Sequence, residues 1–114
     1  MHDILVIDDE DAIVRLLQDY FPLFGYKVVT AKDGNEGIEL FNTGPNFDLV
    51  ITDINMPGID GNAVAKSIRN SKRPDVPIVG MSGQDDNTDG ELFNSMVMKP
   101  FNLKALMEVV EQLV

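Results

Sequence analysis

Five short apolar runs along the chain have the pattern of strands that are buried on both faces. The first, residues 4–7, reads Ile-Leu-Val-Ile and stops at two aspartates. A continuous run of this length, rich in β-branched residues, is typical of a parallel sheet with both faces covered. Further strands are expected at residues 26–31, 48–52, 76–81 and 96–98.

Longer segments between these runs carry apolar residues at three- and four-residue steps, the spacing of one helix face. The first helix is expected from residue 11 to residue 21, with Pro22 ending or kinking it and Gly25 as a stop. Residues that commonly cap helices indicate where the other helices begin. They are expected from Asp33 to about Phe41, from Asp60 or Gly61 to about Ser71, and from Asn102 onward.

The alternation of strands and helices predicts the α/β class. Five strands with about five helices require one doubly wound parallel sheet with helices on both faces. Right-handed crossovers leave few topologies, and any active crevice lies at the carboxyl ends of the strands. No repeat, low-complexity tract or linker interrupts the pattern, so residues 1–114 are expected to form one domain.

Composition and charge narrow the classes of function. The chain has 19 acidic and 9 basic residues, a formal net charge of −10. Such a surface repels nucleic-acid phosphates and anionic lipids, so no direct binding to nucleic acid or membrane is expected. Cysteine is absent, which excludes thiolate metal sites and thiol nucleophiles. Without a signal-peptide pattern or a membrane-length apolar run, a cytoplasmic location is expected.

Chemically useful side chains follow four of the five strands. Asp8 and Asp9 follow the first strand, Asp53 the third, Ser82 the fourth and Lys99 the fifth. These positions converge because the carboxyl ends of parallel strands share one edge of the sheet. Three carboxylates so placed repel one another unless a cation joins them, and oxygen ligands suit Mg²⁺. The sequence therefore predicts a magnesium site, with Lys99 as a second, fixed positive charge.

A carboxylate in this setting can attack phosphorus and form an aspartyl phosphate. The reaction requires neutralisation of the negative charge on the phosphoryl oxygens. Asp53 is the expected nucleophile because it stands alone on the central strand, whereas Asp8 and Asp9 are expected to hold the metal. The Lys99 ammonium and the Ser82 hydroxyl are expected to bind phosphoryl oxygens.

Four motifs, in order and covering the whole chain, resemble the receiver domains of two-component response regulators. Residues 4–10 resemble the acidic-pair strand of the family, and residues 48–61 (DLVITDINMPGIDG) resemble its phosphoacceptor segment. Residues 81–83 resemble the hydroxyl switch strand, and residues 98–101 resemble the lysine motif. The resemblance implies a flavodoxin-like fold with strand order 2-1-3-4-5.

The resemblance also implies roles for individual residues. Asp9 would ligate Mg²⁺ directly, beside Asp53, and Asp8 at least through water. The backbone carbonyl of Asn55 would complete the protein ligands. The bond between Lys99 and its following proline would be cis.

The partners implied by the resemblance are signalling proteins. The phosphoryl donor would be a phosphohistidine on a sensor histidine kinase or phosphotransfer domain, or a small acyl phosphate. The domain would catalyse only its own phosphorylation and slow dephosphorylation, and would thereby change its binding to a downstream protein. It would act alone or as part of a longer regulator.

Two features depart from the family pattern. Met96 occupies the position where receivers usually carry an aromatic switch residue, which puts the coupling from site to surface in question. The stretch 82–99 is shorter than usual by more than one helical turn and is rich in Asp, Asn and Gly. We therefore expect the fourth helix to be very short or missing, with Leu92 and Phe93 tucked onto the sheet.

Other interpretations of the same residues stay open at this point. Asp8 and Asp9 could form a solvated turn, and a serine before a glycine, as at Ser82, is common in turns. The whole chain could be a receiver-like interaction module that works without phosphorylation. A Mg²⁺-dependent phosphohydrolase is disfavoured, because such enzymes typically place a second carboxylate two residues after the nucleophile, where this chain has Asn55.

Overall fold

The computed structural model describes residues 2–83, 88 and 90–114. Its helices and strands follow the expected alternation. In order they are β1 (His2–Ile7), α1 (Asp11–Tyr20), the 3₁₀ helix η1 (Phe21–Phe24), β2 (Tyr26–Ala31), α2 (Gly34–Thr43), β3 (Leu49–Asp53), α3 (Gly61–Arg69), β4 (Ile78–Ser82), the 3₁₀ turn η2 (Gly90–Leu92), β5 (Ser95–Met98) and α4 (Leu103–Leu113).

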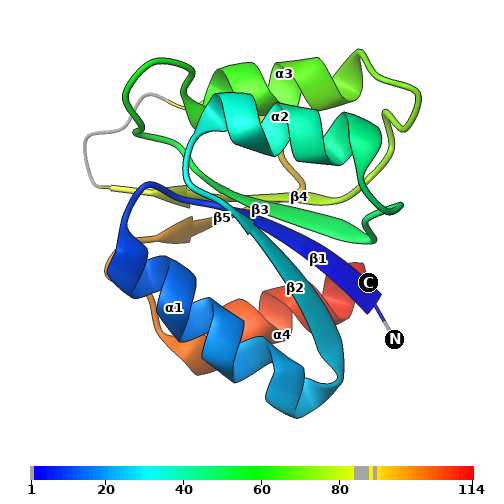
Figure 1. The fold of residues 1–114 in the computed structure, drawn as a ribbon. Coiled ribbons are helices and arrows are strands. Elements are labelled where there is room, and N and C mark those ends of the chain that lie inside the picture. Colours follow the sequence, from blue (N-terminus) through cyan, green and yellow to red (C-terminus); the bar gives the residue numbers. More distant parts are fainter. Residues whose placement is uncertain (1, 84–87, 89) are drawn as a thin grey trace.

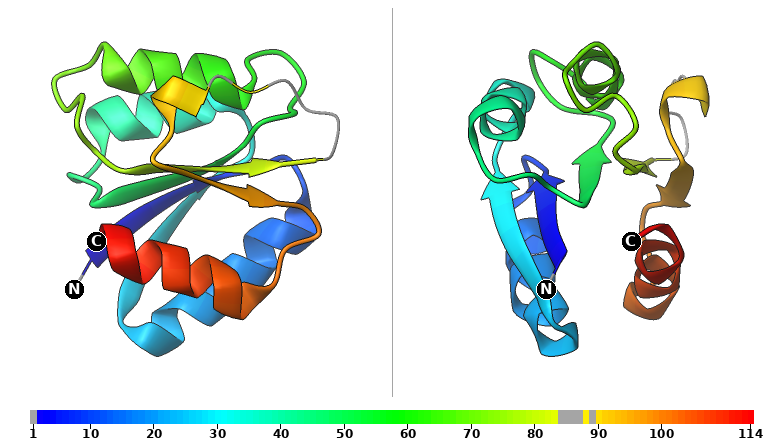
Figure 2. Two further views of the ribbon diagram at one scale, coloured as in Figure 1. Left: turned by 180° about the vertical axis from the view of Figure 1, so that it is seen from behind. Right: turned by 90° about the vertical axis from the view of Figure 1, so that its right-hand side faces the viewer.

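The five strands form one parallel sheet in the order β2-β1-β3-β4-β5. Helices α2 and α3 cover one face, and α1 and α4 cover the other (Figure 1). The right-hand view in Figure 2 shows the sheet between these two layers. The doubly wound fold and the strand order 2-1-3-4-5 are therefore confirmed.

The continuous apolar run of β1 supplies both layers of the core. Ile4 and Val6 pack in the cluster that contains Leu17 of α1 and residues of α4. Their neighbours Leu5 and Ile7 pack in the cluster on the other face, with residues of α2 and α3. Because successive side chains of a strand point to opposite faces, a strand covered on both sides needs an unbroken apolar run.

The capping and stop residues expected from the sequence begin and end helices in the structure. Asp33, Asp60 and Asn102 each cap a helix, because a side-chain oxygen of each accepts a hydrogen bond from a backbone N–H in the first turn. After α1 the chain tightens into η1 at Pro22. Gly25 then ends it with a positive φ of 85°, a conformation that glycine adopts without a steric penalty.

Element boundaries differ from the expected ones by a few residues. β4 begins after Pro77, which has no N–H to donate to a ladder, although its carbonyl still accepts from Val50 at 2.9 Å. α3 ends at Arg69, before Ser71. Both the N–H and the hydroxyl of Ser71 donate to the carbonyl of Ile68, at 3.0 and 2.6 Å, and this tighter turn closes the helix.

The connection between β4 and β5 contains only η2 among its described residues, in place of a regular helix. Four α-helices are thus seen in the described ranges, rather than about five; part of this segment, 84–87 and 89, lies outside them. Leu92 and Phe93 pack against the core cluster on the α2–α3 face, as expected. The Arg69 side chain ties α3 to this segment through the carbonyl of Leu92 and the amide oxygen of Asn94.

Candidate functional site

The carboxyl ends of β1, β3 and β5 bring one lysine and three carboxylates together. The Lys99 ammonium lies 3.3 Å from Asp53 Oδ2, 3.2 Å from Asp8 Oδ2 and 2.9 Å from Glu10 Oε1. The Asp8 and Asp53 side chains are 0% and 5% exposed, whereas Glu10 is 57% exposed. Two buried carboxylates therefore share one cation with a third carboxylate at the surface.

Backbone contacts fix the strand ends that carry these groups. After Asp53, the N–H of Ile54 donates to the carbonyl of Met81 in β4. The N–H of Gly61 donates back to the Ile54 carbonyl, and a Cβ at Gly61 would overlap the carbonyl oxygen of Asp53. Only glycine allows this close approach, so the loop after Asp53 folds tightly against the end of β3.

Lys99 is held at the edge of the sheet by its own backbone. Its N–H donates to the carbonyl of Ser82 at 2.7 Å, which extends the pairing of β4 with β5 by one residue. The Lys99–Pro100 peptide bond is cis, as the resemblance implies. The side chain then reaches back over the ends of β1 and β3.

The turn from β1 into α1 orients Asp8. Its Oδ1 accepts a hydrogen bond from the Glu10 N–H at 2.9 Å, so its second oxygen is left for Lys99. Glu10 is the N-cap of α1 by position, but its side chain makes no capping hydrogen bond. That side chain extends to Lys99 instead.

The electrostatics of the site follow from burial and crowding. Burial raises the pKa of Asp53 to about 6, helped by the Asp8 carboxylate and opposed by Lys99. Burial also raises the pKa of Asp8, against hydrogen bonds from the Glu10 N–H and Lys99. Burial alone would lower the pKa of Lys99, but Glu10, Asp8 and Asp53 outweigh this effect and raise it. At neutral pH Asp53 is thus mainly ionised, and Lys99 is charged.

The ligand atoms available for a metal are all oxygens. Carboxylate oxygens of Asp8, Glu10 and Asp53 lie within 4.8 Å of one another. A cavity of about 160 Å³ opens between Glu10, Asp53, Asn55, Gly83 and Lys99. Three carboxylates with only one ammonium leave an excess of negative charge, so the donor set is compatible with Mg²⁺.

The remaining residues expected at the site lie around this cluster. Asp9 is exposed and is not in the group of three close carboxylates, although its charge contributes to the raised pKa of Asp53. Asn55 is exposed and lines the cavity. Ser82 is buried at the end of β4, where its hydroxyl donates to the carbonyl of Gly83 at 2.9 Å. The ligand roles of Asp9 and Asn55 stay predictions.

Comparison with known proteins identifies the family. The model of the response regulator receiver domain matches residues 4–111. This chain belongs to the response regulator receiver family. The receiver is 38% identical over 110 residues to a probable transcriptional regulator, ycf27, of Cyanidium caldarium. It is 36% identical over 104 residues to the alkaline phosphatase synthesis transcriptional regulatory protein PhoP of Bacillus subtilis.

The receiver is shorter than these relatives. The matches include 92% and 87% of this chain, but only 43% and 42% of the two relatives. The chain thus spans less than half of the curated regulators that it matches.

Solved structures of full receiver length resemble this receiver over its entire chain. The response regulator TrrA of Thermotoga maritima, solved in complex with Mg²⁺ and beryllium fluoride, has 39% identity and a TM-score of 0.91, with 100% of both chains covered. The Vibrio cholerae chemotaxis protein CheY4 has 26% identity and a TM-score of 0.89, covering 100% of this chain and 99% of its own.

Within the described residues, no helix has the length and apolar character of a membrane span.

Met96 of this receiver lies over a glycine of the neighbouring strand. Met96 pairs in register with Gly80, and a Cβ at Gly80 would lie 2.5 Å from Met96 Sδ and 3.2 Å from Ile54 Cδ1. The missing side chain of Gly80 therefore gives the methionine a place on the sheet, next to the residue that follows Asp53.

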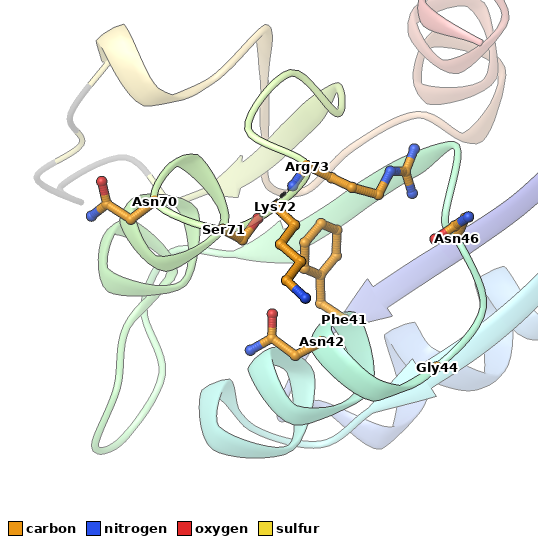
Figure 3. A pocket seen from close by; sticks show the side chains of 8 residues that line it. All are labelled: Phe41, Asn42, Gly44, Asn46, Asn70, Ser71, Lys72 and Arg73. Carbon is orange, nitrogen blue, oxygen red and sulfur yellow. Dashed lines mark hydrogen bonds between the residues drawn. The ribbon is translucent and has the colours of Figure 1, made fainter.

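A larger cavity, of about 530 Å³, lies at the opposite end of the sheet (Figure 3). It is lined by Phe41, Asn42, Gly44, Asn46, Asn70, Ser71, Lys72 and Arg73. The Lys72 side chain points toward Asn42 near the end of α2, and Arg73 donates to the carbonyl of Phe47 at 2.6 Å. A cation near a helix C-terminus offsets the partial negative charge of the free carbonyls there, which gives Lys72 a structural explanation, and Arg73 supplies a donor to a backbone carbonyl in the loop before β3.

The sequence analysis did not identify three residues that the structure shows to be important: Glu10 in the site, and Arg69 and Gly80 in the packing around β4 and β5. Glu10 extends the acidic pair by one residue, and that continued acidic run was a signal in the sequence. Arg69 and Gly80 carry no such signal, because their partners are a distant segment and a neighbouring strand.

Proposed function

We propose that this receiver accepts a phosphoryl group on Asp53 and thereby changes its binding to a downstream protein. The observation that carries the proposal is the ion pair of Asp53 with Lys99 at 3.3 Å, in a cavity at the carboxyl end of the central strand β3. A nucleophile with a fixed cation beside it suits phosphoryl transfer, which depends mainly on positioning and charge.

In the proposed reaction a carboxylate oxygen of Asp53 attacks phosphorus, and an O–P bond forms. The bond from phosphorus to the donor breaks: the P–N bond of a phosphohistidine, whose imidazole leaves and takes up a proton, or the P–O bond of an acyl phosphate. With a pKa of about 6, Asp53 is mainly ionised at neutral pH and available as the nucleophile.

Two side chains of the receiver would bind the transferred group. The Lys99 ammonium would turn from the carboxylates to a phosphoryl oxygen. The Ser82 hydroxyl, which donates to the Gly83 carbonyl in this structure, would turn to donate to a second phosphoryl oxygen. Both contacts place donors where negative charge develops.

Mg²⁺ is proposed as the cofactor. Asp8, Asp9 and Asp53 would hold it with the backbone carbonyl of Asn55, and carboxylate oxygens of Asp8 and Asp53 already lie within 4.8 Å of each other. When bound, the ion would neutralise the negative charge shared by the carboxylates and the phosphoryl oxygens.

The proposed donor is a sensor histidine kinase or a phosphotransfer protein. A groove of about 430 Å³ borders the site and shares Glu10 and Lys99 with it. Its remaining lining comes from α1 and from the segment before α4: Ile13, Leu16, Pro100 and Phe101. An apolar groove beside a nucleophile suits a protein surface that presents a phosphohistidine, since apolar contacts there would hold the donor in line.

The proposed output is regulatory rather than metabolic. The receiver would catalyse only its own phosphorylation and dephosphorylation. Since the curated relatives are named as transcriptional regulators and are more than twice as long as the matched region, we propose that such a receiver controls an effector. With a net charge of −10, it would not itself contact nucleic acid.

The proposal is tested by incubating the protein with acetyl phosphate, with and without Mg²⁺, and measuring the intact mass. A Mg²⁺-dependent adduct of one phosphoryl group is expected for the wild type and not for Asp53→Asn. Asp19→Asn, an exposed aspartate in α1, is the matched control and should be labelled like the wild type. A wild type that takes no label and shows no response to beryllofluoride would instead favour an interaction module that works without phosphorylation.

A further inference from the structure

We propose that Glu10 is a positioning residue, which holds the Lys99 ammonium at the mouth of the site in the unphosphorylated receiver and releases it when Asp53 carries a phosphoryl group. This inference rests on the proposed function. It gives Glu10 a role distinct from ligation of a metal, because the role is exerted on the lysine.

The contacts of Lys99 single out Glu10. Its 2.9 Å hydrogen bond to Glu10 Oε1 is shorter than its contacts with Asp8 at 3.2 Å and Asp53 at 3.3 Å. Asp8 and Asp53 lie deep in the site, whereas Glu10 lies at the surface. The shortest contact of the lysine is therefore the one that draws it outward, away from the nucleophile.

The backbone around Glu10 is fixed, while its side chain has no other assignment in the fold. Its N–H donates to Asp8 Oδ1, and its carbonyl accepts from the N–H groups of Ile13 and Val14 at 3.1 Å. The carboxylate makes no capping hydrogen bond to α1. A rigid backbone with an uncommitted carboxylate is suited to holding a neighbouring cation in one place.

Glu10 also stands between the two openings at this edge of the sheet. It lines both the cavity around Asp53 and the apolar groove that borders it, and Lys99 is the other residue common to both. The pair thus lies on the path from the groove to the nucleophile. A phosphoryl group on Asp53 would place anionic oxygens next to Lys99, and the ammonium can turn to them only by giving up a carboxylate.

Glu10 is the carboxylate that Lys99 would leave. Its exposed carboxylate can be solvated by water when the ion pair opens, whereas the buried carboxylates of Asp8 and Asp53 cannot. The Glu10–Lys99 contact then exists in the free state and not in the phosphorylated state. A contact made in only one of two states shifts the equilibrium toward that state, so Glu10 would oppose activation.

The test compares Glu10→Gln with Asp11→Asn in the full chain, using Mg²⁺ and beryllofluoride as the phosphoryl mimic. Asp11 is also exposed and stands next to Glu10, so its variant removes the same charge without touching the ion pair of Lys99. Affinity for beryllofluoride is measured by titration at constant Mg²⁺. Glu10→Gln should bind about three- to fivefold more tightly than the wild type, the upper part of the range for an exposed ion pair, and Asp11→Asn less than twofold.

A spectroscopic signal separates positioning from a general change in structure. The ¹⁵N signal of the Lys99 ammonium should differ between wild type and Glu10→Gln in the free state, because the shortest partner is lost. With beryllofluoride bound, the two proteins should give the same signal. Thermal unfolding of Asp11→Asn should match the wild type, whereas Glu10→Gln should stay folded but unfold at a slightly lower temperature, because the ion pair that stabilises the free state is lost.

The outcomes distinguish this inference from the proposed function. A wild type that does not bind beryllofluoride contradicts the proposed function itself. If the wild type binds but Glu10→Gln binds no more tightly than Asp11→Asn, the inference alone is wrong. It is also wrong if the Lys99 signal in the bound state still depends on residue 10.

Discussion

Two partly buried basic side chains, Arg69 and Lys99, lie at opposite ends of strands β4 and β5. They differ in the kind of oxygen atom that they contact. Arg69 donates to neutral oxygens: the carbonyls of Leu92, Pro74 and Val76 and the side-chain oxygen of Asn94. Lys99 instead faces the carboxylates of Asp8, Glu10 and Asp53. Burial lowers the pKa of Arg69, whereas the carboxylates raise that of Lys99.

The comparison shows that one end of the sheet carries structural hydrogen bonds, whereas the other end carries the charged groups of the candidate site. The guanidinium of Arg69 makes four hydrogen bonds, three to backbone carbonyls and one to the Asn94 side chain, and so joins α3 to the segment before β5. The ammonium of Lys99 cannot neutralise three carboxylates. The excess negative charge at that end of the sheet is compatible with a bound cation.

Loss of Lys99 should have the largest functional effect. Lys99→Met is expected to slow labelling by acetyl phosphate by about 100-fold or more, because a fixed charge that stabilises the transition state is removed. The variant should still fold, as far-ultraviolet circular dichroism would show. Lys104→Met, at an exposed position in α4, is the control and should be labelled at the wild-type rate. Labelling of Lys99→Met at that rate would remove Lys99 from the mechanism.

Loss of Arg69 should instead reduce stability. Arg69→Met is expected to lower the free energy of unfolding by about 2–3 kcal/mol, because several acceptors lose their donor at once. Lys66→Met is the matched control, since Lys66 is an exposed cation on the same helix. Urea denaturation measures both variants. If the two variants lose equal stability, the hydrogen bonds of Arg69 to the segment before β5 do not stabilise the fold.

The burial of Asp53, reinforced by the nearby Asp8 carboxylate, predicts a stability penalty that depends on pH. The pKa of Asp53 rises from 3.8 in the unfolded chain to about 6 in the fold, so the folded state binds the proton more tightly. Stability should therefore fall as the pH rises from about 4 to about 6, and the penalty should be fully present above that range.

Asp53→Asn removes this penalty. In EDTA the variant should be up to about 3 kcal/mol more stable than the wild type at pH 7.5, with a gap that narrows toward pH 4.5. Urea denaturation at the two pH values measures it. Mg²⁺ should stabilise the wild type more than the variant if the ion binds the folded state at Asp53, as proposed. A gap that is the same at both pH values would contradict the burial argument.

The smallest effect is expected from giving Arg69 a charged partner. Asn94→Asp keeps an oxygen that accepts from both Arg69 and the Ile78 N–H, and adds a negative charge at an exposed position. The free energy of unfolding should change by less than about 1 kcal/mol, as for surface ion pairs. Acetyl phosphate labelling should be unchanged. A change in labelling would show that the two ends are coupled.

Much of the fold was predictable because local patterns and long-range packing agree. The apolar run before Asp8 belongs in a doubly covered strand, and Asp33, Asp60 and Asn102 cap the helices as expected. Boundaries were less predictable, as at Ser71, where a side-chain hydrogen bond ends α3 early. The motif spacing also placed Asp8, Asp53 and Lys99 at one edge of the sheet, where the structure brings them together.

The sequence by itself determined the strand ends that carry the chemistry, because the carboxyl ends of parallel strands must share one edge. Only the tertiary structure decided which oxygens meet the Lys99 ammonium: Glu10 extends to it, while Asp9, one residue earlier, is exposed and outside the close group. Only the tertiary structure paired Arg69 with the segment before β5 and placed Met96 over Gly80. Such contacts depend on side-chain directions and on distances between segments remote in sequence, which periodicity and spacing do not specify.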